Sequence, residues 1–251
     1  MTSMTALPIR RPEAPVGPTT GDHVRTVVRG IGELFITLGA LLLLLCVYQL
    51  WWTNVESAAA TSVERDQIVQ QWAKGPAVVL PLATGATKPV AKPAYGSGFA
   101  LLYIPRLKDK VWGLPIIEGV GLDVLAKGAG HYPEAAMPGQ VGNFAIAAHR
   151  ATHNEPFRNI DDLRVGDKVY VQTRTAWFTY VLNRTKIVKP TARWVIQPVP
   201  GRPNATPTEK LITLTTCNPR WASYERFIWW GTMSATQPAS AGAPDGITGT
   251  A

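Results

Sequence analysis

The sequence contains few of the residues that build metal, cofactor and disulfide sites. Its 251 residues include two cysteines and four histidines. No pair of His, Cys, Asp or Glu has metal-ligand spacing on one element, so we expect no metal. The chain also lacks a P-loop, a GxSxG elbow and a dinucleotide fingerprint, so no cofactor is expected. The formal net charge is +8, but no basic run alternates with aromatic residues, and we expect no nucleic-acid partner.

Charged residues are absent from the run Leu34 to Trp52, which is 19 positions long. As a helix this run would span roughly 28 Å, close to the thickness of the hydrocarbon core of a bilayer. Two tryptophans at its far end are typical of a membrane interface. We therefore predict a single transmembrane helix over residues 30–52.

The flanking charges predict how this helix is oriented. Arg25 and Arg29 precede it, whereas Glu56 follows it. The positive-inside rule then places the N-terminus in the cytoplasm and the rest of the chain outside the cell membrane. A cleaved signal peptide is the alternative, because residues 58–60 are small. The apolar run is longer than the hydrophobic region of a signal peptide, which favours an uncleaved anchor.

This orientation separates the two cysteines. Cys46 lies in the predicted span and Cys217 in the outer domain, so the two cannot pair. An unpaired thiol on the oxidising side of a membrane is a liability unless it is used or protected. Cys217 follows residues 211–216, which are rich in β-branched residues and predict a strand. The alternative is that Cys217 is a small buried hydrophobic residue.

Arg226 begins the next predicted strand, nine residues after Cys217. A thiol at the end of one strand and a guanidinium at the start of its neighbour can face one cleft. A positive neighbour helps a thiol to become a thiolate, and a developing oxyanion needs a donor. We therefore predict that Arg226 serves both purposes.

In the remaining chain, segments with helical or unstructured patterns are followed by segments whose patterns predict short strands. We predict a disordered cytoplasmic tail over 1–29, a juxtamembrane helix and Pro/Ala-rich linker over 53–98, a β-domain over 99–232 and a disordered tail over 233–251. Within the β-domain, a short helix is predicted at 156–163, and strands are predicted at 99–104, 111–118, 143–148, 167–173, 177–188, 211–216 and 226–230. Short strands with regular turn signals are typical of an all-β closed or nearly closed barrel.

His149 directly follows the predicted strand 143–148. Most histidines at strand ends are hydrogen-bonded structural residues. The alternative is that His149 is the proton-transfer partner of Cys217, because Cys–His partners meet in space rather than in sequence. His131 and His153 lie in predicted loops.

These residues resemble the motifs of the sortase family. Residues 213–217 read T-L-T-T-C, which is similar to the sortase signature T-L-x-T-C, and Arg226 matches the arginine that follows it. Residues 147–150, with Thr152 and the Pro-Phe pair 156–157, look like the histidine segment of actinobacterial class E sortases. The resemblance covers about residues 99–231.

The resemblance implies a closed eight-stranded sortase-type β-barrel with short helices and the activity of a cysteine transpeptidase. Such an enzyme would cleave a C-terminal sorting signal of a surface protein, of LAXTG or LPXTG type, between Thr and Gly. Cys217 would hold the product as a thioester and pass it to a peptidoglycan precursor amine, with His149 transferring protons and Arg226 holding the substrate and oxyanion. Thr216 is a candidate further donor, and Tyr132 is a candidate reader of the second signal position.

Two alternatives remain open. One is a membrane-anchored cysteine endopeptidase that passes the acyl group to water. The other is a non-catalytic β-barrel that binds envelope proteins, with Cys217 buried in it.

Overall fold

The structure is a computed structural model that describes residues 20–74 and 90–248. The chain divides into two compact units, one ending at Gln49 and one beginning at Leu50. Residues 1–19 of the predicted cytoplasmic tail and residues 75–89 of the predicted linker lie outside the described part of the chain.

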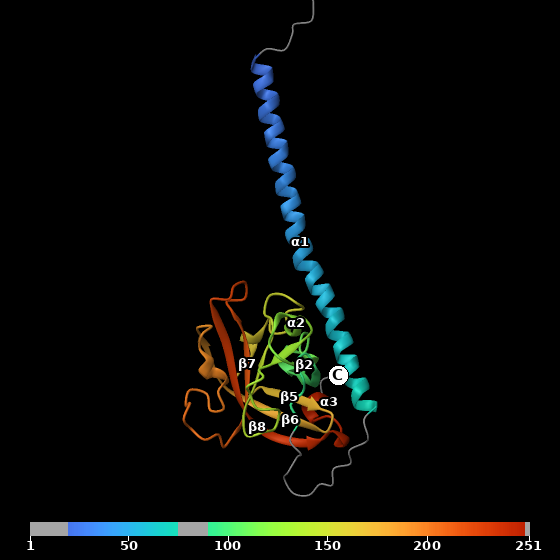
Figure 1. Cartoon of the computed structure of the whole chain (residues 1–251), viewed down its shortest axis with the longest axis vertical. Helices are drawn as coiled ribbons and strands as arrows, with labels where there is room; N and C mark the ends of the chain where they lie inside the picture. The colour runs from blue at the N-terminus through green and yellow to red at the C-terminus, as the bar shows by residue number, and fades with distance from the viewer. Residues whose placement is uncertain (1–19, 75–89, 249–251) are drawn as a thin grey trace, which may run out of the picture. The chain divides into compact units, whose positions relative to one another are not determined.

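One continuous helix, α1 (Thr20–Lys74), contains both the predicted anchor and the predicted juxtamembrane helix (Figure 1). Within the described residues it is the one helix long and apolar enough to span a membrane. The predicted disorder of residues 20–29 is wrong, because these residues are helical. Extending an existing helix costs far less than starting one, so the apolar run propagates into its polar flank.

Eight strands form a closed barrel in the order β1-β2-β3-β4-β7-β8-β6-β5, as predicted for the fold class. Their bounds are β1 Gly98–Tyr103, β2 Trp112–Glu118, β3 Ala129–His131, β4 Gly142–Ala147, β5 Lys168–Thr173, β6 Ala176–Val188, β7 Lys210–Asn218 and β8 Glu225–Pro238. The short helices are η1 Pro105–Leu107, α2 Leu122–Leu125, η2 Ile160–Asp162, η3 Arg193–Ile196, η4 Ala239–Ala241 and α3 Asp245–Thr248.

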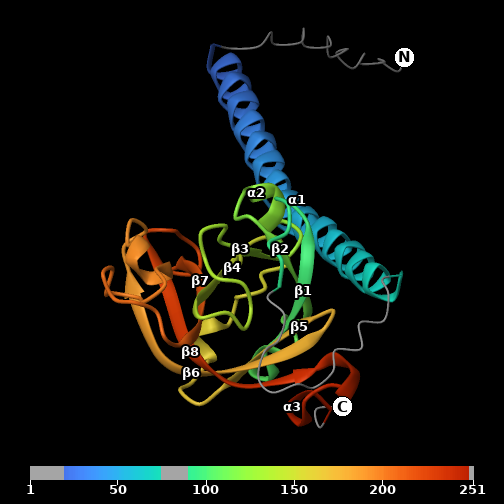
Figure 2. The same cartoon turned by 60° about the horizontal axis from the view of Figure 1, so that its bottom comes forward.

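Strands distant in sequence lie side by side in this barrel. β4 pairs with β7 in parallel from Gly142↔Lys210 to Ala147↔Thr215. β7 pairs with β8 antiparallel, and the two longest strands, β6 and β8, run together along one side of the barrel (Figure 2). The ends of β4 and β7 therefore meet at one edge, and β8 begins beside them.

Alternation along β7 separates the core from the site. Ile212 and Leu214 are fully buried in the main hydrophobic cluster. Because successive side chains of a strand point to opposite faces, Thr213, Thr215 and Cys217 share the other face.

Two further predictions of the element map are wrong. Residues 129–131 form strand β3 instead of part of a loop, because β2 and β4 both offer backbone partners to a segment too short to show a periodic pattern. Residues 233–248 are structured, because β8 continues to Pro238 by pairing with β6 and is followed by η4 and α3. Backbone pairing to one neighbour holds this part of β8, although after Met233 its side chains are mostly small or polar.

Candidate active site

Cys217 and Arg226 are directly opposite each other in the β7–β8 ladder. Directly paired residues of an antiparallel sheet project from the same face, so the thiol and the guanidinium share one side of the sheet. β7 runs through Cys217 to Asn218 rather than ending before it, and the thiol is free and half-buried. Arg226 Nη1 donates to the carbonyls of Ser223 and Glu225 at 3.0 and 2.9 Å, which fixes one end of its fork.

His149 follows the end of β4 and lines the same cavity as Cys217, a space of about 190 Å³. Its Nε2 atom is buried and has no hydrogen-bond partner in the described part of the chain. Burial, together with a smaller contribution from the neighbouring imidazole of His153, lowers the pKa of His149 to about 4. His149 is therefore neutral near pH 7, has an unpartnered ring nitrogen, and shares a cavity with the residue that carries the thiol.

The loop after His149 holds the imidazole from its other side. His153 stacks on His149 with ring centroids 4.5 Å apart. Thr152 Oγ1 lies 3.4 Å from His149 Nδ1 and 3.0 Å from His153 Nδ1, so one hydroxyl bridges the two rings. His153, Asn154 and Glu155 all have positive φ, a costly backbone conformation that keeps His153 over His149.

Arg150 fixes the C-terminal end of β7, the strand that contains Cys217. Its side chain is buried, and its Nη1 donates to Asn218 Oδ1 at 2.6 Å while its Nη2 lies 3.0 Å from Asp161 Oδ1. The guanidinium also lies over the ring of Phe227, 5.5 Å from its centroid. These contacts join the histidine segment to the residue that follows Cys217.

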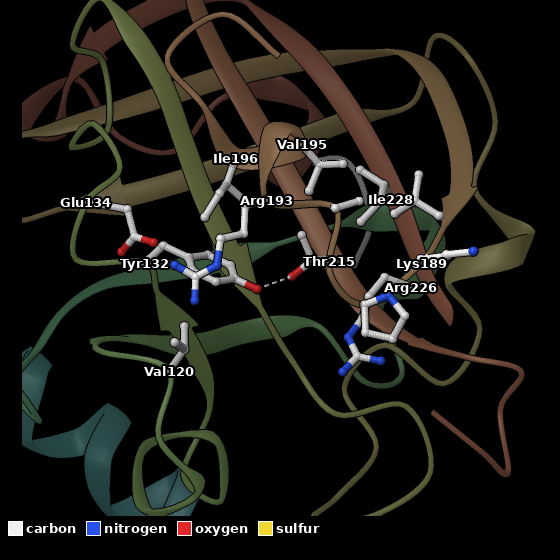
Figure 3. Close-up of a pocket in the computed structure, with 13 residues that line it drawn as sticks. Val120, Tyr132, Glu134, Lys189, Arg193, Val195, Ile196, Thr215, Arg226 and Ile228 are labelled. Atoms are coloured by element: carbon white, nitrogen blue, oxygen red, sulfur yellow. Dashed lines mark hydrogen bonds between the residues drawn. The ribbon is translucent and has the colours of Figure 1, made fainter. Parts of the chain in front are cut away.

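A second cavity of about 260 Å³ is lined by Arg226, the cross-strand partner of Cys217, together with Tyr132 and Thr215 (Figure 3). The Tyr132 hydroxyl is 3.2 Å from Thr215 Oγ1, as Figure 3 shows by the dashed line. Burial raises the pKa of Tyr132, so its hydroxyl remains a neutral donor. Arg193 lines the same cavity, so the site has cationic as well as apolar walls.

The far wall of this second cavity is held by a buried polar network. Asn143 Nδ2 donates to the Val195 and Gln197 carbonyls, and Thr213 Oγ1 donates to Asn143 Oδ1 at 2.7 Å. The Trp230 indole also donates to the Val195 carbonyl at 3.0 Å. Helix η3 is thereby fixed to β4, β7 and β8.

Thr216 points away from both cavities. Its hydroxyl donates to the Ala148 carbonyl at 2.7 Å, and its side chain is buried. The hydroxyl that reaches the second cavity is that of Thr215. Strand alternation accounts for this one-residue difference from the predicted donor.

His131 has a different setting. It is fully buried at the end of β3, with Nδ1 2.6 Å from Glu118 Oε2 and Nε2 3.1 Å from the Ala136 carbonyl. Lys92 Nζ lies 3.9 Å from Glu118 Oε1 and donates to the Pro133 carbonyl at 2.6 Å. This cluster holds the backbone on both sides of Tyr132. Within the described part of the chain, no three His, Cys, Asp or Glu side chains are placed to hold a metal ion.

Sequence reasoning missed several residues of the site. Arg193, Arg220 and the η3 wall carry no motif, Thr215 occupies the variable position of the T-L-x-T-C signature, and the stacked position of His153 depends on an unusual loop conformation. The T-L-T-T-C run could have pointed to Thr215, since alternation places it on the same face as Cys217.

Comparison with known proteins gives consistent matches. The family model described as "Sortase domain" matches residues 102–234. Sortase SrtE1 of Streptomyces coelicolor is 40% identical over 87% of this chain, and the match spans 60% of that relative. Sortase SrtE2 of the same organism is 31% identical over 86% of each chain. The crystal structure of sortase E1 from Streptomyces coelicolor with a tripeptide in its active site is 39% identical, has a TM-score of 0.56, and covers 61% of this chain and 97% of that one.

Proposed function

The chain belongs to the sortase family of cysteine transpeptidases, and from that premise we propose that it cleaves the C-terminal sorting signal of a surface protein between Thr and Gly and joins that surface protein to a cell-wall precursor amine. The observation that carries the proposal is the cross-strand pair Cys217/Arg226, of which Cys217 lines one cavity with His149 and Arg226 lines another with Tyr132.

The first half of the reaction forms a thioester. His149, neutral because burial lowers its pKa to about 4, accepts the proton of Cys217 as the sulfur attacks the Thr carbonyl. Arg226 donates to the oxyanion that forms. The resulting imidazolium is a strong acid for a histidine, so it readily protonates the leaving Gly amine.

The second half transfers the acyl group. An incoming amine attacks the thioester, His149 accepts its proton, and Cys217 leaves as a thiolate that the imidazolium stabilises. The same ring therefore acts as acid and then as base. Its unpartnered Nε2 and the cavity that His149 shares with Cys217 support this role.

The cavity with Tyr132 is proposed to hold the signal on the acyl side of Cys217. A signal with Ala in its second position keeps a backbone N–H that Pro would lack. The neutral Tyr132 hydroxyl, 3.2 Å from Thr215 Oγ1, is placed to bond such a backbone, and the ring can pack on a small side chain. We assign the auxiliary hydroxyl role to Thr215 rather than Thr216, because Thr216 Oγ1 donates to the Ala148 carbonyl.

Helix α1 is proposed to anchor the enzyme with its N-terminus in the cytoplasm and the barrel outside. Arg25 and Arg29 on the N-terminal side of the charge-free run support this orientation. External protease added to intact cells should then digest the barrel, and a barrel that remains protected would contradict the orientation.

The test uses the full chain in detergent with an LAXTG-type peptide, followed by intact-protein mass spectrometry. We expect an added acyl mass on the wild type and none on Cys217→Ala. With a glycine peptide as amine, a ligated product should appear. Hydrolysis alone with every amine would indicate an endopeptidase, and the absence of any thioester would indicate a non-catalytic barrel.

A further inference from the structure

Arg220 lies in the turn after β7, and its side chain lines the same cavity as Cys217 and His149. Its Nε atom is buried with no hydrogen-bond partner in the described part of the chain. Its Cζ atom lies 4.5 Å from the centroid of the Trp221 ring, which orients the guanidinium plane. An oriented guanidinium with an unpartnered donor is suited to bind a carboxylate.

The charges around Arg220 are not balanced. Arg158 lies 2.8 Å from Glu155, and Arg150 lies 3.0 Å from Asp161. Arg220 has only a 3.5 Å contact with Glu155, a carboxylate that already pairs with Arg158. In this cluster three guanidiniums meet two carboxylates, so one positive charge at the cavity wall remains without a counter-charge.

The proposed transpeptidation determines which ligand would meet the positive charge of Arg220. Under the proposed function, the leaving amine departs beside His149, because His149 protonates it. The acceptor amine attacks the same carbonyl and gives its proton to His149, so it occupies the position that the leaving amine has vacated. Substituents of the acceptor therefore extend into the cavity of His149 and Arg220.

We propose that Arg220 binds a carboxylate carried by the acceptor, so that the acceptor is an amino-acid or peptide amine with a free carboxylate close to it. This inference rests on the proposed transpeptidation. In the transfer step the amine nitrogen forms a bond with the thioester carbonyl carbon, and the C–S bond breaks. One amine proton goes to His149, and Cys217 keeps the electron pair of the broken bond as a thiolate. The carboxylate is not consumed and serves to orient the amine.

The experiment compares matched acceptors on the full-length enzyme in detergent. Diglycine and triglycine are compared with their C-terminal amides, which carry the same nucleophile without the carboxylate. We expect the free acids to show a KM for the acceptor roughly tenfold lower than the amides, as for a charge-assisted hydrogen bond. The preference should shrink as NaCl is raised, because salt screens a partly exposed pair.

Two variants assign the effect to Arg220. Arg220→Gln should raise the KM of the free acids to that of the amides while leaving the amides unchanged, and Arg220→Lys should restore part of the preference through its charge. Arg174→Gln is the matched control: Arg174 is exposed between β5 and β6 and lines neither cavity, so the same loss of charge there should keep the preference.

The outcomes separate this inference from the proposed function. Thioester formation with the signal peptide alone tests the proposed function and does not involve an acceptor. If the thioester forms but acids and amides react equally in the wild type, the carboxylate site is overturned. A preference that survives in Arg220→Gln, or a loss that affects acids and amides alike, overturns it as well. If Arg220→Gln fails to fold, the wild-type comparison and its salt dependence still decide the question.

Discussion

His131 is fully buried and His149 is partly buried, both near strand ends, and their surroundings differ in every respect that matters for proton transfer. Both nitrogens of His131 face acceptors, the Glu118 carboxylate and the Ala136 carbonyl. His149 has one nitrogen near the Thr152 hydroxyl at 3.4 Å and one buried nitrogen without a partner in the described part of the chain, and the residue shares a cavity with the only free thiol of the described barrel. Burial alone therefore does not distinguish the proposed catalytic histidine; its unsatisfied nitrogen and its shared cavity with Cys217 do.

The largest expected difference between the two histidines is in turnover. His149→Ala should lower transpeptidation roughly 10²–10⁴-fold, the range for loss of a general acid–base group. Cys217→Ala and Arg226→Ala should also lower it by orders of magnitude. His131→Ala should retain much more activity per folded molecule. Rates with an LAXTG-type peptide and amine, normalised to folded protein, measure this.

Two controls sharpen that result. Arg226→Lys should remain poor although it keeps the charge, because Lys lacks the planar fork that bonds the carbonyls of Ser223 and Glu225 while facing the cavity. If His131→Ala abolished turnover in a folded barrel while His149→Ala did not, the assignment of the two histidines would be reversed.

The next effect concerns stability and runs the opposite way. His131→Ala leaves the Glu118 carboxylate buried without its 2.6 Å partner, and breaking a buried pair typically costs about 3–5 kcal/mol. Denaturant unfolding should show this loss for His131→Ala and a smaller one for His149→Ala. Glu118→Gln combined with His131→Ala should cost less than the sum of the single changes, because the two residues share one interaction. Additive losses would show that the pair is not coupled.

A smaller effect is expected for substitution of Tyr132, the residue after His131. Because Tyr132 lines the cavity that we propose holds the sorting signal, Tyr132→Ala should remove the preference for LAXTG over LPXTG peptides. Such contacts discriminate by roughly 10–200-fold. Peptide competition measures the ratio, and thioester formation at Cys217 should persist. An unchanged ratio would remove Tyr132 from the proposed site, and a wild-type preference for LPXTG would contradict the assignment to class E specificity.

The smallest effect concerns His153 and the titration of His149. The pKa of His149 is lowered to about 4, first by burial and then by His153. His153→Ala should therefore raise this pKa, which NMR titration of the ring would follow. Since the folded value lies below the ordinary 6.5, the unfolded chain binds more protons between these values. Stability should fall as pH drops from about 6.5 to 4, less steeply in His153→Ala. A His149 that titrates near 6.5 in the folded wild type would contradict the buried environment.

Much of the fold could be predicted because its signals are local. The charge-free run predicts the long apolar helix within α1, and seven of the eight strands carry β-branched or alternating stretches. Strand β3 was not predicted because its three residues are too few to show a periodic pattern. The C-terminal end of β8 was not predicted because backbone pairing with β6, rather than a pattern in its own side chains, holds it in the sheet.

The site could be predicted only where chemistry is tied to a motif. Cys217 and Arg226 follow from strand-end positions nine residues apart, and the register pairs them directly. The stacking of His153 and the open charge of Arg220 could not be predicted, since both arise from loop conformations that bring separate segments together. The exchange of Thr216 for Thr215 shows how a one-residue step in a strand moves a hydroxyl to the other face.

The parallel pairing of β4 with β7 has a consequence for how the enzyme folds. His149 follows the end of one strand and Cys217 lies near the end of the other, so contacts across more than sixty residues of chain assemble the site. Pairing over such separations requires a long loop to close, which makes it slow relative to local hairpins such as β5–β6. We therefore expect a refolding chain to regain hairpin structure before it regains reactivity toward a signal peptide. A partly folded chain would then carry its thiol without the partner that makes it an enzyme.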